Sequence, residues 1–327
     1  MGEKPKDLSS INTELLTEEE KQSKRQSERL GYQYGVLCQF LWAIVSIQLK
    51  TMVTLFPDAY SLNTIAFWRN FPLLLYGYYS CKKKGIKIHS WNEIENKFWF
   101  IIRSLGFYFL ILFWVLMNIY FRVSTCQCIC NCNPIIVLII SSIILREKFY
   151  PRYVIGVIIC IAGAFMIVSN EKGGKNNSSD EKEKNIALGI TFSLIHLTIT
   201  SFANFGQRLI SKEGIQGDEQ NVFLGLFNIV PAFFVMLIQG YTGLSNIKYI
   251  LYVMTNSPVF YFANYFNAQA LKYISINKFI PLIYLSILFV FILGFIFLGE
   301  KVYFTDIIGS LLILGFQVYN IYIPTTK

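Results

Sequence analysis

Apolar residues in this sequence gather in long blocks, and this clustering constrains the fold more than any other feature. The blocks run for 18 to 25 residues with few charges, and a helix of about 20 apolar residues crosses a hydrocarbon core of ~30 Å. Only 15% of the 327 residues are charged and 54% are hydrophobic, whereas soluble domains carry about 25% charged residues. The sequence therefore predicts an all-α polytopic membrane protein embedded in a lipid bilayer.

Ten membrane spans are predicted from these blocks. They cover residues 34–56, 59–80, 98–121, 124–145, 152–169, 186–210, 221–241, 249–272, 277–298 and 303–323. Residues 1–31 mix acidic and basic side chains without apolar periodicity, so they are predicted to form a disordered tail. The polar residues 170–185 are predicted to link two halves, and residues 324–327 form a short C-terminal tail.

The basic residues indicate how the chain is oriented in the membrane. The net charge is +9, but most lysines and arginines lie in loops beside the spans, as the positive-inside rule expects of cytoplasmic loops. The charge is therefore explained by topology, and no nucleic-acid partner is predicted. Both termini are expected on the cytoplasmic side, with the linker on the opposite side.

The two halves of the chain resemble each other at regular offsets. The aligned pairs are Gly35 with Gly189, Trp42 with His196, Arg122 with Lys272, Glu147 with Glu300 and Gly156 with Gly309, at offsets of 150 to 154. Each half holds five spans, an odd number, so the second half enters the membrane from the opposite side. Two inverted five-helix repeats are typical of alternating-access transporters, which bind solute near the midplane where the repeats meet.

Short motifs at the ends of two spans carry a family resemblance. The fourth span ends in "ILREK" and the ninth in "FLGEK", and a glycine stands nine residues after each glutamate. Together with the repeats, these motifs resemble the drug/metabolite transporter superfamily, its members with tandem EamA-type domains and the related nucleotide-sugar and organophosphate branch. The resemblance covers residues 32–323, with repeats at 32–169 and 186–323, and it implies a solute carrier without a cofactor.

A finer similarity concerns the start of the ninth span. The stretch "INKFIP", which begins at Ile276, is similar to the Asn-Lys that nucleotide-sugar transporters carry there and that contacts the nucleotide. This resemblance makes Lys278 a candidate for contact with the substrate.

Four cysteines alternate in "STCQCICNCNP", which begins at Ser124. Metal binding, redox sensing and packing are three uses of such a cluster. Alternate residues on a helix diverge by about 200°, so Cys126 and Cys130 share one face while Cys128 and Cys132 share another. A zinc site needs four converging ligands, whereas small residues let helices approach closely. We therefore predict that the cysteines pack between helices and hold no metal.

The predicted spans hold basic groups near their centres but no central carboxylate. Arg69 lies in the middle of the second span, where a charge costs about 2.5–3.5 kcal/mol on insertion scales. It therefore needs a partner or an aqueous cavity. Contact with a substrate and hydrogen bonds to carbonyls freed by Pro72 are the two interpretations. Arg103 and Lys50 lie closer to span ends and can reach the membrane interface.

Further side chains are candidates for lining a substrate pathway. They are Trp42, Asn133, His196, Asn228, Asn264, Asn267 and Tyr284. Hydrogen bonding between helices is the alternative for the asparagines, and a packing role is the alternative for His196. Pro134, next to Asn133, frees a carbonyl in the fourth span.

The paired motif residues are interpreted as structural. Glu147 and Glu300 end their spans at the water boundary, beside basic residues that complement helix ends, with a role in coupling as the alternative. Gly156 and Gly309 suit close helix packing, either within the bundle or across a homodimer.

These observations predict a secondary transporter of a small organic solute. Basic groups without buried acids favour an anionic metabolite: a nucleotide sugar, an organophosphate or a carboxylate. The sequence has no G-x-x-x-x-G-K-[ST] loop and no H-E-x-x-H motif, so neither direct ATP use nor a zinc protease is expected. A polytopic enzyme and a receptor or scaffold without transport are the alternatives.

Overall fold

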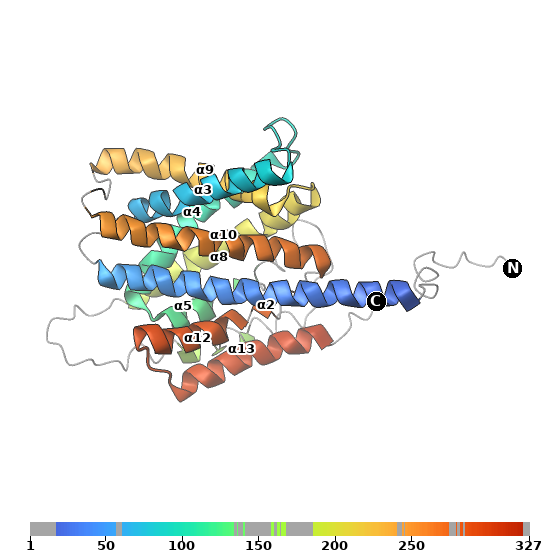
Figure 1. Ribbon diagram of the computed structural model, residues 1–327. Coiled ribbons are helices and arrows are strands. Elements are labelled where there is room, and N and C mark those ends of the chain that lie inside the picture. Colours follow the sequence, from blue (N-terminus) through green and yellow to red (C-terminus); the bar gives the residue numbers. More distant parts are fainter. Residues whose placement is uncertain are drawn as a thin grey trace.

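A computed structural model describes most of the chain. The described residues are 18–56, 61–133, 136, 140, 158–159, 162–163, 165–167, 186–240, 244, 246–274, 279, 282–283 and 285–322. The regular secondary structure within these ranges is helical (Figure 1). The all-α class is thus what the structure shows for this part of the chain.

Most described helices follow predicted spans. They are α2 (Glu18–Leu55), α3 (Leu62–Lys84), α4 (Lys97–Tyr120), α5 (Val123–Cys130), α8 (Ile186–Lys212), α9 (Gly217–Gln239), α10 (Ile247–Tyr273), α12 (Leu285–Leu298) and α13 (Phe304–Tyr322). Four segments within the described residues are long and apolar enough to cross a membrane, and Leu285–Leu298 is a shorter apolar helix. The four are Arg25–Leu55, Lys97–Tyr120, Ala187–Gln207 and Gly217–Gln239.

Helix α2 begins earlier than the sequence suggested. It starts at Glu18, so the prediction of disorder is wrong for residues 18–31. The three glutamates Glu18 to Glu20 lie in the first turn, where negative charge is favourable, and the following Lys, Arg, Gln and Glu residues are good helix formers. Because a membrane span anchors the helix, extending it needs no new nucleation and no apolar periodicity.

The fourth span is interrupted near the middle of the bundle. The sequence predicted one helix over residues 124–145, whereas α5 ends at Cys130 and residues 131–132 form a turn. The N–H of Asn131 donates to the carbonyl of Gln127 at 3.0 Å, which completes the last turn. Pro134 has no N–H to offer the Cys130 carbonyl four residues earlier, which favours a break at this point, and residue 133 is again helical.

Three antiparallel helix pairs build most of the described bundle. In the first pair, the start of α2 lies against the end of α10, because a side chain on Gly31 would meet Ile274. At the other end the rings of Phe56 and Tyr249 are 5.7 Å apart. Figure 1 shows the two helices side by side along their length.

Helices α4 and α8 pair in the same manner. Gly189, near the start of α8, lies against Phe121 just after α4, and Gly206 lies against Trp99 at the start of α4. At both contacts an added Cβ would come within 3.0 Å of the neighbouring atom. Glycine at these two positions therefore lets the helices approach closely.

Helices α3 and α9 form the third antiparallel pair. The Asn63 side chain at the start of α3 donates to Gln239 Oε1 at the end of α9, at 3.2 Å. Near the other end, Gly77 lies against Val222 and Gly225 against Leu74. The two glycines permit reciprocal close contacts between the same pair of helices.

The remaining contacts fix the relative directions of all six helices. Helix α3 runs parallel to α10, since Ser257 donates to the Arg69 carbonyl and the ring of Tyr76 lies 6.3 Å from that of Tyr261. Helix α4 likewise runs parallel to α9, since the Phe100 ring lies 4.7 Å from that of Phe223 and, further along both helices, Asn228 donates to the Ser104 carbonyl. As a result each of these three helices of the first half runs opposite to its own counterpart in the internal alignment: α2 to α8, α3 to α9, and α4 to α10.

The apolar core lies where the two halves meet. Buried residues of α2, α3 and α4 pack with residues of α9 and α10 in one cluster, and they include Ala43, Ile65, Val115, Leu224 and Phe260. The inverted pairs thus share one core, and the polar residues described next lie inside it.

Candidate functional site

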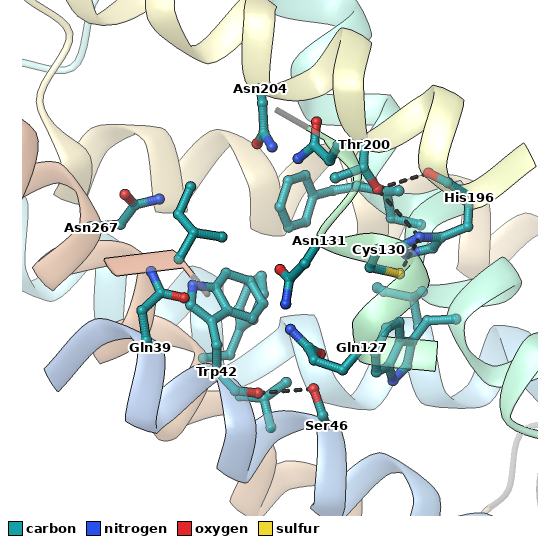
Figure 2. A pocket seen from close by; sticks show the side chains of 18 of the residues that line it. Gln39, Trp42, Ser46, Gln127, Cys130, Asn131, His196, Thr200, Asn204 and Asn267 are labelled. Atoms are coloured by element: carbon teal, nitrogen blue, oxygen red, sulfur yellow. Dashed lines mark hydrogen bonds between the residues drawn. The ribbon is translucent and has the colours of Figure 1, made fainter. Parts of the chain in front are cut away.

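A cavity of about 200 Å³ lies between the two halves, at the level of the middle turns of the helices (Figure 2). Helices α2, α3, α4 and α5 line it from the first half, and α8 and α10 from the second. Its aromatic lining is Trp42, Phe107, Trp114, Phe260 and Phe279. Its polar lining is Gln39, Ser46, Arg69, Gln127, Asn131, Asn133, His196, Thr200, Asn204 and Asn267.

Arg69 contributes a positive charge to this cavity. It is 3% exposed, and its Cζ lies 4.2 Å from the centre of the Phe260 ring, a cation–π contact that orients the guanidinium. Its buried Nε makes no hydrogen bond, and within the described residues no carboxylate pairs with it. Bonds to carbonyls freed by Pro72 are likewise not seen in this part of the chain. The charge lies against an aromatic ring, and no counter-ion is found for it among the described residues.

Two other basic residues singled out in the spans are placed differently. Arg103 is also 3% exposed and lies 4.1 Å from the Phe107 ring centre, but it is not part of the cavity lining. Lys50 donates to the carbonyls of Asn118 and Phe121. It satisfies the C-terminal end of α4, where a cation is favourable.

Two amides on the interrupted fourth span enter the cavity, and sequence reasoning missed both. Gln127 donates through Nε2 to Ser286 Oγ at 3.0 Å, and Asn131 donates through Nδ2 to the same oxygen at 3.2 Å. Ser286 lies on α12, so the contact joins the two halves. The signal available in the sequence was the proline at position 134, since a proline four residues after Cys130 cannot donate to its carbonyl and predicts a break in the helix there.

His196 and Asn133 line the cavity where residues of the fourth span meet α8. The Nδ1 atom of His196 is 3.2 Å from Cys130 Sγ and 3.4 Å from Thr200 Oγ1, as Figure 2 shows. The Oδ1 atom of Asn133 accepts from Ser201 Oγ at 3.0 Å. Both predicted residues line the cavity, and each is oriented by a neighbour from the other half.

Trp42 and Asn267 line the cavity as well, whereas two predicted asparagines do not. Trp42 packs edge-on against Phe260 at 5.4 Å between ring centres. Asn228 is buried and donates to the Ser104 carbonyl at 3.2 Å, and Asn264 donates to a carbonyl of its own helix. Asn228 and Asn264 therefore lie outside the cavity lining, and their place in the pathway stays a prediction.

Several predicted residues lie outside the described residues. They are Pro134, Glu147, Gly156, Lys278 and Tyr284. Their proposed roles stay predictions.

Glu300, the motif glutamate of the second half, contacts the first residues of α5. Its Oε1 accepts from the Val123 N–H at 2.8 Å, and its Oε2 accepts from Ser124 Oγ at 2.9 Å. The N–H groups of a first turn have no partner within the helix, so this carboxylate caps α5 from the opposite half. The geometry agrees with the structural interpretation of the motif.

A buried ion pair lies beside this cap. Arg122 Nη1 is 3.0 Å from Asp306 Oδ2, and Nη2 is 3.3 Å from Oδ1. Arg122 also donates to the Lys301 carbonyl at 2.6 Å. We refer to Arg122, Ser124, Glu300 and Asp306 as the α5 junction, which ties the start of α5 to the segment after α12 and to the first turn of α13.

Gly309 packs within the chain. A Cβ on it would lie 2.6 Å from the Gly163 carbonyl oxygen, so only glycine allows this approach. Use of such glycines across a homodimer stays a prediction.

The cysteines point to different neighbours. Cys126 and Cys128 are fully buried, and Cys128 Sγ is 3.8 Å from Ser310 Oγ. Cys130 faces His196, and Cys132 lies 3.8 Å from the Cys128 carbonyl. No group of three or more metal-binding side chains occurs in the part of the chain that the structure covers. This arrangement suits packing.

Comparisons with known proteins address the fold and the family. The sequence matches the EamA-like transporter family twice, over residues 29–169 and 187–318. One solved structure, titled only "Crystal structure of protein", is similar with a TM-score of 0.59 and 12% identity over 90% of this chain and 96% of that chain. No curated protein matches the sequence.

Proposed function

The chain belongs to the EamA-like transporter family, a family of small-solute membrane transporters, and on this basis we propose that it moves a small organic anion by alternating access. In this proposal it has ten membrane spans in two inverted five-helix repeats, and both termini face the cytoplasm. The solute binds in the cavity between the repeats.

One observation supports the proposed negative charge of the solute. Arg69 places a guanidinium in the cavity without a carboxylate partner in the described residues. Low-dielectric walls strengthen the field of such a charge, so an anion gains from entering and a cation loses. A guanidinium also binds carboxylate or phosphate oxygens in a bidentate manner.

The size of the cavity favours one kind of anion. Its volume is about 200 Å³, below the roughly 300–1,000 Å³ of pockets for drug-sized ligands. A small carboxylate or organophosphate suits this volume better than a nucleotide sugar, which was among the expectations from sequence.

The helix directions support alternating access. Three helices of the first half run opposite to their counterparts, and the cavity lies between the halves. Transporters with inverted repeats bind solute near the midplane at the repeat interface and expose it by rocking one unit against the other.

Basic residues support the proposed orientation. The bundle end that holds the start of α2 carries Arg25, Arg29, Lys82 to Lys84 and Lys97 (Figure 1). Positive charge beside spans favours the cytoplasmic side. Tags at the N terminus and within residues 170–185, probed before and after permeabilisation, should label from opposite sides. Labelling from the same side would show that the five-plus-five topology is wrong.

Flux through reconstituted vesicles tests the function. Purified protein is placed in liposomes, and counterflow is measured with labelled lactate, glycerol phosphate and choline. We expect an anion to be carried, and we expect Arg69→Gln to lose this flux while Arg103→Gln keeps it. Arg103 is the matched control because it is equally buried on a phenylalanine but lies outside the cavity lining. Carriage of choline alone, or wild-type flux by folded Arg69→Gln protein, would contradict the proposal.

A further inference from the structure

Ser286 determines which atoms of two cavity amides face the solute. It is 1% exposed, and its hydroxyl has one proton and two lone pairs to use. The proton goes to the Ile283 carbonyl at 2.6 Å. Ser286 Oγ must therefore accept from both Gln127 Nε2, at 3.0 Å, and Asn131 Nδ2, at 3.2 Å.

The amide orientations follow from these bonds. An amide that donates through its nitrogen to Ser286 presents its carbonyl oxygen elsewhere, and both side chains line the cavity. Figure 2 shows the nitrogens of Gln127 and Asn131 turned toward each other, as a shared acceptor requires. No hydrogen bond within the described chain reaches Gln127 Oε1 or Asn131 Oδ1. Two acceptor oxygens are thus available to a solute.

The C-terminal end of α5 lies at the same cavity. The helix stops at Cys130, which also lines the cavity. The last carbonyls of a helix lack partners within it and carry a partial negative charge. Pro134 cannot donate to the Cys130 carbonyl, so this helix end favours a hydrogen-bond donor nearby.

We propose that the cavity recognises a hydroxyl group on its solute through Gln127 Oε1 and Asn131 Oδ1, with Ser286 as the positioning residue. This inference rests on the function proposed above and narrows it. The solute is a small hydroxy-carboxylate or hydroxyl-bearing phosphate ester, and its keto analogue is rejected. Without a donor, the two amide oxygens would be desolvated and unpaired, and such sites discriminate strongly against analogues that lack the group.

Matched pairs of probes test this preference. The pairs are L-lactate and pyruvate, lactamide and pyruvamide, and 1-amino-2-propanol and aminoacetone, which represent an anion, a neutral solute and a cation. Binding is measured by thermal denaturation of the purified full-length protein across a range of probe concentrations, because a ligand of the folded state raises its stability. We expect L-lactate to bind about tenfold or more tightly than pyruvate.

Substitution of Ser286 separates positioning from a merely structural role. In Ser286→Ala the amides can turn either end toward the solute, so the lactate-to-pyruvate ratio should fall to about twofold or less. Ser286→Thr keeps the hydroxyl and should keep the ratio. Ser310→Ala is the control, since Ser310 is a buried serine outside the cavity lining that donates to the Asp306 carbonyl.

The outcomes distinguish this inference from the proposed function. The hydroxyl preference is overturned if the wild-type protein binds the hydroxyl and keto members of every pair equally. It is also overturned if the wild-type protein binds neither member of any pair. An unchanged lactate-to-pyruvate ratio in folded Ser286→Ala protein overturns the positioning role of Ser286. If that variant does not fold, Gln127→Leu tests the proposal by removing one of the two acceptor oxygens. The anion proposal fails in a different way, when a neutral or cationic hydroxyl probe binds and L-lactate does not.

Discussion

Two regions of the molecule bury charged groups and treat them in opposite ways. At the α5 junction, Arg122 and Asp306 form a bidentate pair, and Glu300 accepts hydrogen bonds from the first turn of α5. In the cavity, Arg69 is 3% exposed, and among the described residues its guanidinium lies against the Phe260 ring and pairs with no carboxylate. The first region pairs its charges within the protein, and the second holds one charge for which the described part of the chain supplies no counter-ion.

The difference indicates what each charge is for. Burying an ion is costly, and a protein offsets that cost with a partner and hydrogen bonds. The α5 junction does so, which suits a structural connection between the halves. A buried charge that is left unpaired in a cavity suits a site whose counter-ion arrives from solution. Substitutions should therefore damage stability at the junction and binding in the cavity.

The largest effect is expected from Arg122→Leu. It removes the arginine partner of Asp306, whose side chain is 0% exposed, and removing one partner of a buried ion pair costs about 3–5 kcal/mol. The free energy of unfolding, measured by denaturant titration in detergent, should fall by this amount. Adding Asp306→Leu removes the buried carboxylate as well and should restore most of the loss. Arg122→Leu protein as stable as wild type would contradict the contrast between the α5 junction and the cavity.

The next effect concerns Arg69→Lys. The variant keeps the positive charge but replaces a planar fork with a single ammonium. Affinity for L-lactate should fall about tenfold, equivalent to roughly 1.4 kcal/mol, while the free energy of unfolding changes little because no partner is stranded. A large loss of stability with unchanged affinity would place Arg69 in the same class as Arg122.

A smaller effect is expected from Ser124→Ala. Ser124 Oγ donates to Glu300 at 2.9 Å, and losing one hydrogen bond to a charged acceptor costs about 1.5 kcal/mol. The measurement is the same denaturant titration, with Ser80→Ala as control because Ser80 donates to a different carboxylate, that of Asp218. An unchanged free energy of unfolding in Ser124→Ala would show that this hydrogen bond does not stabilise the α5 junction.

The smallest effect is expected from Cys126→Ala with Cys128→Ala. Both thiols are buried and pack between helices, so the pair should lose about 1 kcal/mol or less and keep its affinity for L-lactate. Metal analysis of the wild-type protein should find no stoichiometric zinc. Zinc that is present in wild type and lost in the variant, together with stability, would contradict the packing account.

Signals that repeat along the chain could be predicted from the sequence. Apolar blocks gave the helices, and the internal alignment placed Trp42 and His196 at equivalent positions, both of which line the cavity. Arg69 stood out because a charge in a span is costly wherever the span lies. These arguments need only local composition and periodicity.

Contacts between distant segments could not be predicted in this way. Asn228 and Asn267 are the same residue type in neighbouring spans, yet only Asn267 lines the cavity, because helix rotation depends on packing. The role of Ser286 arises from α5 and α12 meeting across the halves. The break in the fourth span coincides with Pro134 in the sequence, from which only a freed carbonyl was predicted.

The charge preference of the cavity tests the central claim most directly. L-lactate, lactamide and 1-amino-2-propanol are similar in size and differ in charge, and calorimetric titration gives their affinities for wild-type and Arg69→Gln protein. The account predicts that wild type binds L-lactate most tightly and that Arg69→Gln loses this preference while staying folded. Tightest binding of 1-amino-2-propanol by wild type, or unchanged affinity for L-lactate in Arg69→Gln, would contradict it.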